Sequence, residues 1–311
     1  MRAGASHRLG VLLVAGAAFW WSTGGLFIRA VHTDPWTTIF WRSIFAAATM
    51  FLFIAIRKGG AIGMNGTIGK GEAIGKGRQT LAQFREIGWP GVVMALCFCG
   101  ASVSYVPAVM LTSVANTLIL QSLSPFVAAF LAFLVMREHV NSRTWIAIFV
   151  SFLGVYIMVA RSIAGGSYLG NLLGFGIAVF YATAVVVTRY RRQVQMLPAS
   201  CLAALFGFLL SAGVLVMQHR LPWPLPPADL AILAAFGGLQ MAGGMILFTY
   251  GARLIPAAES ALLSIIESIG APIWVFFIFG EDPGIRAIVG GYIVLSAVTI
   301  YTALDLVRPA E

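Results

Sequence analysis

The segment LTSVANTLILQSLSPFVAAFLAFLVMRE, residues 111–138, recurs in altered form 143 positions later as LIPAAESALLSIIESIGAPIWVFFIFGE, residues 254–281. A second segment, residues 9–29, recurs 160 positions later as residues 169–189 and agrees with its copy at eight of 21 positions. The coinciding pairs include Leu111/Leu254, Ala115/Ala258, Glu138/Glu281 and Arg29/Arg189. This agreement exceeds what a shared apolar composition supplies, so we interpret the chain as an internal duplication of about 150 residues.

The composition places this duplication in a lipid bilayer. The 311 residues are 59% hydrophobic and 10% charged, with a mean hydropathy of +0.91, which leaves too little polar surface to cover a soluble globule. Since about 20 helical residues cross the hydrocarbon core, the apolar runs have the length of membrane spans. They predict an all-α polytopic membrane protein with ten transmembrane helices, at residues 9–28, 36–56, 89–105, 112–136, 143–160, 169–188, 197–217, 228–250, 256–280 and 284–306.

The basic residues behind the net charge of +9 predict the orientation of the chain. With the N-terminus in the cytoplasm, most of the Lys and Arg residues fall in connections on the inner side, as the positive-inside rule requires. We therefore expect cytoplasmic N- and C-termini and a location in the bacterial inner membrane. Membrane lipid, anionic lipid in particular, then becomes the partner of the basic residues, which argues against nucleic acid.

The parity of the spans predicts how the two copies are related. The first repeat, residues 9–161, and the second, residues 168–307, hold five spans each. Because five is odd, the second copy enters the membrane the opposite way up from the first. Inverted repeats of this kind are typical of secondary transporters, in which the substrate binds near the membrane midplane between the halves.

Neither the cysteines nor the glycine-rich loop predicts a bound metal or cofactor. The cysteines Cys97, Cys99 and Cys201 lie inside predicted spans and lack the spacing of a disulfide framework or a zinc site. Residues 57–86 form a connection rich in glycine and lysine, but they miss the spacing and the Ser/Thr of a phosphate-binding loop and no strand precedes them. We expect a flexible cytoplasmic loop near anionic headgroups.

Aromatic residues in mid-span positions form the first group of candidate site residues. Trp20 and Trp21 lie beside Ser22 and Thr23 in the first span, and Tyr181 occupies the corresponding part of the sixth. Tyr105 ends the third span. These side chains either pack against neighbouring helices or line a pocket, since aromatic walls with a few polar groups are favoured in small-molecule sites.

Arg42 is the costliest residue of the predicted membrane region. It lies about two turns inside the second span, where a central arginine costs about 2.5–3.5 kcal/mol on insertion scales. The side chain either reaches the outer interface or caps backbone carbonyls, or it faces the pathway and holds an anionic group of the substrate with two hydrogen bonds.

The fourth and ninth spans, the duplicated centre, combine prolines with polar groups. Pro125 and Pro272 each remove a backbone hydrogen bond and are the predicted hinges. Further pathway candidates are Asn116, Gln121, Glu259, Glu267 and Trp274. An ionisable residue as deep in a span as Glu267 is by default expected to neutralise a charge on the substrate or to carry a proton. The alternative is a structural carboxyl group that is protonated or paired with an arginine. Glu259 lies near its helix start, where a negative charge also suits the helix dipole.

The motifs of these two spans support a resemblance to a known family. Thr112, Ser113, Val114, Ala115, Pro125, Ala128, Ala129 and Glu138, echoed by residues 255–262, Glu267, Gly280 and Glu281, resemble the twin EamA repeats of the drug/metabolite transporter superfamily. The resemblance implies a ten-helix carrier in which helices one to four and six to nine surround the cavity and helices five and ten are peripheral. Many members export amino acids, metabolites or drugs. Arg137 replaces the usual glycine before Glu138, and Ser268 stands where a proline is common.

These observations together predict a secondary transporter, and more specifically an exporter, of a small amphipathic metabolite such as an amino acid. Arg42 would bind an anionic group, Glu267 an amine or a proton, and the aromatic residues the apolar body, partly through cation–π contacts. The alternatives are an exporter of diverse cationic compounds and a channel-like facilitator. An enzyme is disfavoured because the four histidines are scattered and form no metal-binding spacing. No particular oligomeric state is predicted.

Overall fold

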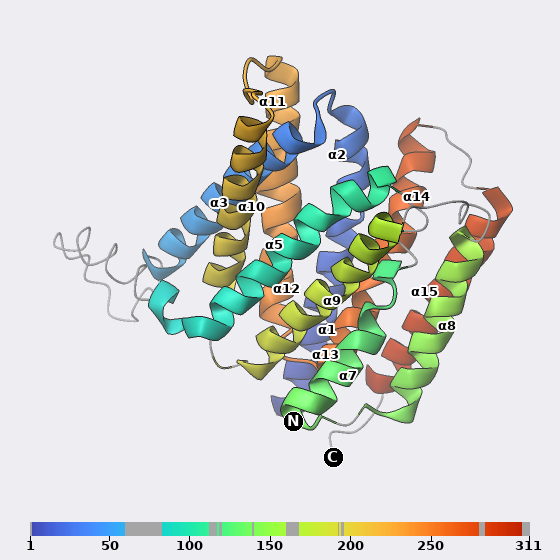
Figure 1. Cartoon of the computed structure of the whole chain (residues 1–311). Helices are drawn as coiled ribbons and strands as arrows, with labels where there is room; N and C mark the ends of the chain where they lie inside the picture. The colour runs from blue at the N-terminus through green and yellow to red at the C-terminus, as the bar shows by residue number, and fades with distance from the viewer. Residues whose placement is uncertain are drawn as a thin grey trace.

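A computed structural model describes residues 2–59, 83–111, 117, 120–138, 140–159, 168–191, 193, 196–279 and 284–306. Within these ranges every regular element is a helix, and the helices form one bundle (Figure 1). The middle of the predicted cytoplasmic loop, residues 60–82, lies outside the described residues, as does Asn116. The all-α fold class is confirmed.

The helices of the first repeat follow the predicted spans. The first span consists of α1 (Arg2–Trp21) and α2 (Gly24–Ala30), and the second is α3 (Pro35–Gly59). The third is α5 (Gly88–Leu111), and the described part of the fourth contains α7 (Ser124–Met136). The fifth span is α8 (Ser142–Val159).

The second repeat begins with α9 (Tyr168–Tyr190) and α10 (Leu197–Met217). The eighth span joins α11 (Pro227–Ala234), the π-helical segment η1 (Ala235–Met241) and α12 (Ala242–Gly251). The ninth joins α13 (Ala257–Ser264) to α14 (Ile266–Phe279), and the tenth is α15 (Gly284–Leu306). Among the described residues, six helical stretches are long and apolar enough to cross a membrane, and three shorter apolar helices accompany them.

The packing of the helices shows the exchange symmetry of inverted repeats. Helices at corresponding positions of the two copies pack against each other, as α3 does with α10 and α8 with α15. The contact of α5 with α9 has its counterpart in the contact of α12 with α1. The corresponding helices run antiparallel, because Cys201 Sγ donates to the carbonyl of Ala47 at 3.5 Å while the earlier Ser43 meets the later Gly207. Two copies related in this way are inverted, as their odd number of spans predicts.

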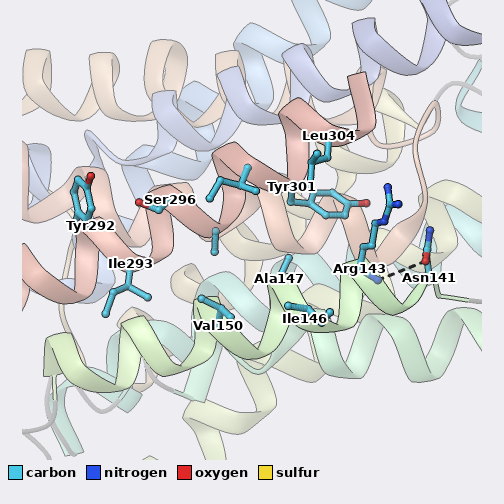
Figure 2. A pocket seen from close by; sticks show the side chains of 12 residues that line it. Asn141, Arg143, Ile146, Ala147, Val150, Tyr292, Ile293, Ser296, Tyr301 and Leu304 are labelled. Atoms are coloured by element: carbon cyan, nitrogen blue, oxygen red, sulfur yellow. Dashed lines mark hydrogen bonds between the residues drawn. The ribbon is translucent and has the colours of Figure 1, made fainter. Parts of the chain in front are cut away.

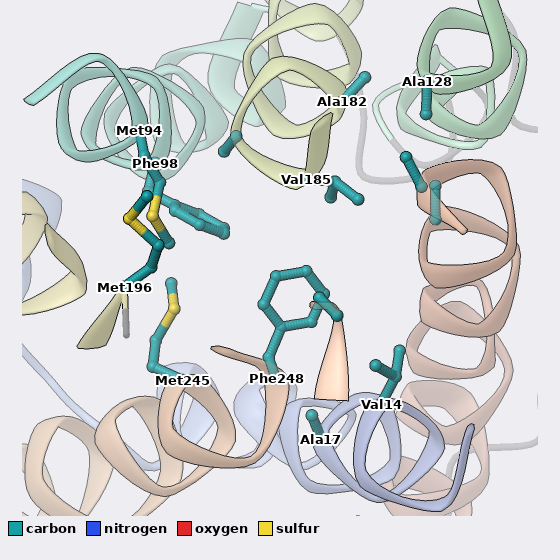
Figure 3. Close-up of a cluster of buried hydrophobic side chains, with 14 of the residues drawn as sticks. Val14, Ala17, Met94, Phe98, Ala128, Ala182, Val185, Met196, Met245 and Phe248 are labelled. Carbon is teal, nitrogen blue, oxygen red and sulfur yellow. The ribbon is translucent and has the colours of Figure 1, made fainter. Parts of the chain in front are cut away.

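Small side chains bring these helices together. The buried core is rich in alanine, contributed by both repeats, and the larger Phe98, Phe248, Met94 and Met245 fill the space between them (Figure 3). In a bilayer the surrounding lipid is as apolar as leucine, so close van der Waals contact takes over much of the role that the hydrophobic effect plays in water. Alanine-rich faces permit this close approach.

Two helix ends explain local features of the sequence. Asp34 precedes Pro35 at the start of α3, and its Oδ1 accepts the backbone N–H groups of Trp36 at 3.0 Å and Thr37 at 3.2 Å. Arg137 ends α7 with a φ of 56°, in the left-handed region. Glycine adopts this conformation without a steric penalty, which gives a physical reason for the glycine usual at this place in the family.

Three spans are interrupted near their middle. The first turns at Ser22 and Thr23, the fourth at Ser122 and Leu123, and the ninth at Ile265. Ser122 and Ile265 are 143 positions apart and therefore correspond in the duplication. A broken helix leaves some backbone N–H and C=O groups without their helical hydrogen bonds. Inside a membrane such a break occurs only where other parts of the protein or a water-filled cavity provide hydrogen bonds to these groups.

The prolines relate to these breaks in different ways. Pro125 lies in the first turn of α7, directly after the break in the fourth span, where its missing N–H costs nothing. Pro272 lies within α14, seven positions after Ile265. The interruption of the ninth span therefore precedes Pro272, and Ser268 takes the position that corresponds to Pro125.

Candidate substrate site

Arg42 points into the bundle. Its Nη2 donates to Ser102 Oγ of α5 at 2.6 Å, and its guanidinium carbon lies 5.2 Å from the ring centroid of Phe236 in η1. A guanidinium over an aromatic face is attracted by the ring quadrupole. The Nε atom is buried and makes no hydrogen bond with the described residues. The side chain is therefore held between α5 of the first repeat and η1 of the second.

Two tyrosines connect the surroundings of Arg42 with Glu267. Tyr105 of α5 lies within electrostatic range of both Arg42 and Glu267. Tyr181 of α9 also lies within range of Glu267, and its hydroxyl hydrogen-bonds Ser264 Oγ at 2.5 Å. We define the central cluster by these side chains and list it here as Arg42, Ser102, Tyr105, Tyr181, Ser264 and Glu267.

Glu267 differs from the other members because its carboxylate has no direct partner. It is the second residue of α14 and lies halfway through the ninth span. Among the described residues it makes neither a hydrogen bond nor an ion pair. Arg42, Tyr105, Tyr181 and Glu267 are half-buried, so each retains surface that a solute can contact.

The break in the first span lies beside this cluster. Ser22 Oγ and Thr23 Oγ1 donate to the carbonyls of Phe19 and Trp20, and Gln240 Nε2 of η1 donates to the carbonyl of Trp21 at 2.9 Å. Each bond satisfies a backbone group in the broken helix.

Trp274 and Trp21 pack around the same break. Trp274 Nε1 donates to Ser22 Oγ at 2.9 Å, which joins α14 to the end of α1. A Cβ on Gly270 would approach Ser22 Oγ to 2.5 Å, so a glycine is required where the two segments touch. Trp21 packs on Phe248 with ring centroids 5.4 Å apart, and Phe248 is 5.9 Å from Tyr181. Trp21, Phe248 and Tyr181 thus form one aromatic region, whereas Trp274 is connected to the break through Ser22 and its ring contacts Phe19.

Several predicted site residues are not brought to this region. Trp20 is 45% exposed and donates its Nε1 to the carbonyl of Leu239, itself an exposed residue. Trp20 therefore lies on the outside of the bundle although its neighbour Trp21 points inward. Gln121 is half-buried immediately before the break in the fourth span. Asn116 lies outside the described residues.

Glu259 belongs to a second polar group at the end of the bundle where α1 begins and α15 ends, which we call the terminal face (Figure 1). His7 Nε2 lies 2.9 Å from Glu259 Oε2, and the Tyr301 hydroxyl donates to Glu259 Oε1. Thr144 Oγ1 donates in turn to the Tyr301 hydroxyl at 3.2 Å. These four side chains form the terminal-face cluster, which ties α1 and α13 to α15 and α8.

An ion pair reinforces the terminal face. Arg189 Nη2 lies 3.2 Å from Glu138 Oε1, and Arg189 Nη1 donates to the carbonyl of Arg253 at 3.1 Å. Glu138 thus ties the end of α9 to the connection after α7. A cavity of about 210 Å³ lies next to it and is lined by both glutamates of this face together with His7, Thr144 and Tyr301. Among the described residues no group of three or more His, Cys, Asp and Glu side chains is placed to hold a metal ion.

Comparison with known proteins identifies the family of this chain. A model of the EamA-like transporter family matches residues 8–160 and again residues 168–303. The chain belongs to this family. The resemblance noted in the sequence is therefore confirmed, and with it the expectation that the chain is a transporter embedded in a membrane.

Individual relatives of this EamA-like transporter agree. The uncharacterized transporter YwfM of Bacillus subtilis is 25% identical over 221 residues, which cover 67% of this chain and 74% of the relative. An uncharacterized transporter of Archaeoglobus fulgidus is 24% identical over 203 residues, covering 63% and 70%. A crystal structure described only as that of a protein shares the fold, with a TM-score of 0.72 at 16% identity over 95% of this chain and 98% of the other.

Sequence reasoning missed four residues that complete the central region. Ser102 and Phe236 hold Arg42, while Ser22 and Gln240 satisfy the broken first span. The signal for Ser22 was its place in the polar pair that follows Trp21. Gln240 could have been found as an amide in the apolar eighth span, where a polar side chain needs an internal partner.

Proposed function

We propose that this EamA-like transporter moves a small zwitterionic, amphipathic metabolite, an amino acid or a close relative, by alternating access. The observation that carries the proposal is the placement of Arg42 and Glu267. The two charged groups come from α3 and α14, which belong to different repeats, and Tyr105 lies within electrostatic range of both. No ion pair joins them among the described residues.

Opposite charges kept apart in this way suit a solute that carries both. Arg42 can bind a carboxylate through the planar fork of its guanidinium, and Glu267 can bind an ammonium group. Had the two side chains been in contact, they would have neutralised each other and left no charge for a substrate. A proton on Glu267 is the other partner that we propose, since an intramembrane carboxyl without a fixed cation can exchange one.

The aromatic region supports the amphipathic nature of the solute. Trp21 and Tyr181 are half-buried and pack on the fully buried ring of Phe248, with ring centroids 5.4 Å and 5.9 Å from it, so the accessible parts of these two rings are the aromatic surfaces that a solute would meet. Such surfaces bind an apolar side chain and attract an ammonium group through the ring face. A purely cationic compound would use Glu267 and the rings but would leave Arg42 buried without an anion.

Alternating access is consistent with the location of the two charged residues, Arg42 on the first repeat and Glu267 on the second. Rocking of one repeat against the other changes the distance between Arg42 and Glu267, and the breaks in the first, fourth and ninth spans provide points of bending. Access from the terminal face requires His7 to release Glu259, because this contact connects α1 of the first repeat with α13 of the second. Tyr301 holds Glu259 within the second repeat, between α15 and α13.

We further propose that the terminal face is cytoplasmic, that the membrane is a bacterial inner membrane and that the solute is exported. Basic residues on described elements at the terminal face outnumber those at the opposite end, in keeping with the positive-inside rule. They are Arg8, Arg137, Arg143, Arg189, Arg191 and Arg253, against Arg29, Arg220 and Arg286 at the opposite end.

The test is counterflow in proteoliposomes. Vesicles are loaded with one unlabelled amino acid at a time, and the uptake of its radiolabelled form is measured with the purified protein. Saturable counterflow for at least one zwitterion, reduced by about 10- to 100-fold in Glu267→Gln, supports the proposal. Counterflow that occurs only for permanently cationic compounds would overturn the zwitterionic substrate class.

A further inference from the structure

A long groove separates α8 from α15 on the outside of the bundle. Figure 2 shows the two helices lying side by side, and the cavity between them measures about 530 Å³. Apolar side chains line most of its length, among them Ile146, Val150, Ile293 and Leu304. The two helices touch within this pair, because a Cβ on Gly154 of α8 would lie 2.7 Å from Val294 Cγ2 of α15, and both Val294 and Ile148 of α8 are fully buried.

One end of the groove is polar and basic. Arg143 and Asn141 lie together at this end, on the terminal face (Figure 2). The Arg143 side chain is exposed, and its backbone N–H donates to Asn141 Oδ1 at 3.5 Å. No carboxylate among the described residues forms an ion pair with Arg143. Arg143 is also the second residue of α8, where the helix dipole favours an anion.

We propose that this groove binds one anionic phospholipid. Its phosphate would contact Arg143 and Asn141, and an acyl chain would lie along the apolar part of the groove between α8 and α15. The lining residues follow the parts of a phospholipid along the groove. Arg143 lies at the end where the headgroup would be, and the apolar residues lie along the rest, where the acyl chain would be. A guanidinium binds phosphate through charge-assisted hydrogen bonds. Phosphatidylcholine carries the same phosphate, but its choline cation cancels the net charge of the headgroup and repels Arg143, so an anionic lipid is favoured.

The groove is continuous with the terminal-face cluster. Asn141 and Tyr301 line the groove and also the 210 Å³ cavity that contains Glu259. A lipid in the groove therefore packs against the tyrosine that donates to Glu259. Bound lipid stabilises the contact of α15 with α13, and for a transporter this favours closure of the terminal face. This second step depends on the proposed function, but binding of the lipid does not.

Native mass spectrometry of the detergent-purified full chain tests the binding. The probes are phosphatidylglycerol and phosphatidylcholine with identical acyl chains, titrated separately. We expect one retained phosphatidylglycerol per chain and at least about fivefold weaker retention of phosphatidylcholine, as the loss of the net attraction between one arginine and an anionic headgroup predicts. Arg143→Gln removes the guanidinium and is expected to reduce retention of phosphatidylglycerol to the level of phosphatidylcholine.

Two further variants separate the groove from general effects. Arg286→Gln removes an exposed arginine from the start of α15, at the opposite end of the same helix pair, and should leave retention unchanged. Ala297→Trp fills the groove and should abolish retention of both lipids while the elution volume and helical content stay those of the wild type. Equal loss in Arg143→Gln and Arg286→Gln, or none in either, would overturn the proposal.

The same mass spectra also test the alternative occupant of the groove, which is a second copy of this chain. A wild-type dimer that Ala297→Trp converts into a monomer, with no lipid retained, would show that the groove is a subunit interface and would refute the lipid site. A wild-type chain that retains lipid but catalyses no counterflow would refute the proposed function and leave the lipid site standing.

Discussion

Two glutamates eight positions apart on the ninth span have opposite surroundings. Glu259 is 4% exposed and has His7 on one carboxylate oxygen and Tyr301 on the other. Glu267 is half-buried and makes no hydrogen bond or ion pair among the described residues. The break at Ile265 separates them and directs Glu259 to the terminal face and Glu267 to the centre. The satisfied carboxylate joins helices, whereas the unsatisfied one is available to a solute.

The largest expected effect separates these two roles. Glu267→Gln keeps the shape of the side chain and removes its charge, so we expect counterflow to fall by about 10- to 100-fold, as for the loss of a hydrogen bond between charged groups. Glu259→Gln should leave the substrate affinity within about threefold of wild type and instead lower the free energy of unfolding by about 1.5–3 kcal/mol. Counterflow and thermal unfolding of both variants check this. Equal loss of affinity in both would abolish the distinction.

Arg42→Lys sharpens the account of the central cluster. Lysine keeps the positive charge but lacks the planar fork, and its ammonium group loses the stacking on Phe236. We expect the apparent affinity for the zwitterion to fall by about tenfold, while the unfolding temperature changes little. Ser102→Ala, which removes only the hydrogen bond that orients the guanidinium, should cost about 1 kcal/mol of binding. A Lys variant with wild-type affinity would show that charge alone suffices.

Gly237→Ala tests whether the close approach of α3 to η1 positions Arg42. A Cβ on Gly237 would lie 2.2 Å from the backbone carbonyl oxygen of Arg42, so the two helices must separate. Overpacking of this kind costs about 1–3 kcal/mol and should lower both the unfolding temperature and the substrate affinity. Gly213→Ala is the matched control, because its Cβ would meet nothing within 4 Å. Similar stabilities of the two variants would contradict this role of Gly237.

The smallest effect is expected at the terminal face. Tyr301→Phe removes the hydroxyl that connects Thr144 with Glu259, which should cost about 1 kcal/mol of stability in the closed form. Since closure and opening of this face are coupled to transport, the counterflow rate should change by less than about fivefold, with the substrate affinity preserved. Labelling of a cysteine introduced at Ala258, which lines the adjoining cavity, should become faster in the variant. Slower labelling would contradict the closing role of Tyr301.

The duplication predicted much of this architecture for a physical reason. Span length and parity are properties of the whole chain, and they predicted the helical spans and the inversion of the two copies without knowledge of any contact. The orientation in the membrane, which the charge bias predicts, stays a prediction. The duplication also relates the breaks at Ser122 and Ile265, because corresponding segments of the copies adopt the same local structure. Proline was a poorer guide, since Pro272 lies within α14 while Pro125 follows its break directly.

The site could be predicted only in part because its contacts join distant segments. The depth of Arg42 and Glu267 marked them as functional candidates, as the cost of burying a charge requires. Their partners Ser102 and Phe236 come from other helices, and helical periodicity contains no information on such pairs. The adjacent Trp20 and Trp21 point in different directions, which depends on how α1 packs against η1 and α12. Glu259 and Glu267, two pathway candidates on the same predicted span, have different surroundings because the helix breaks between them.

The central claim is that Arg42 and Glu267 bind opposite charges of one solute. The most direct test compares counterflow of the best amino acid with that of its decarboxylated amine and its deaminated acid, in wild type, Arg42→Gln and Glu267→Gln. We predict that wild type transports the zwitterion faster than the amine or the acid. Arg42→Gln should transport the amine and the zwitterion at equal rates, because it no longer binds the carboxylate. Glu267→Gln should transport the acid and the zwitterion at equal rates, because it no longer binds the ammonium group. An equal loss for all three compounds in both variants would contradict the account.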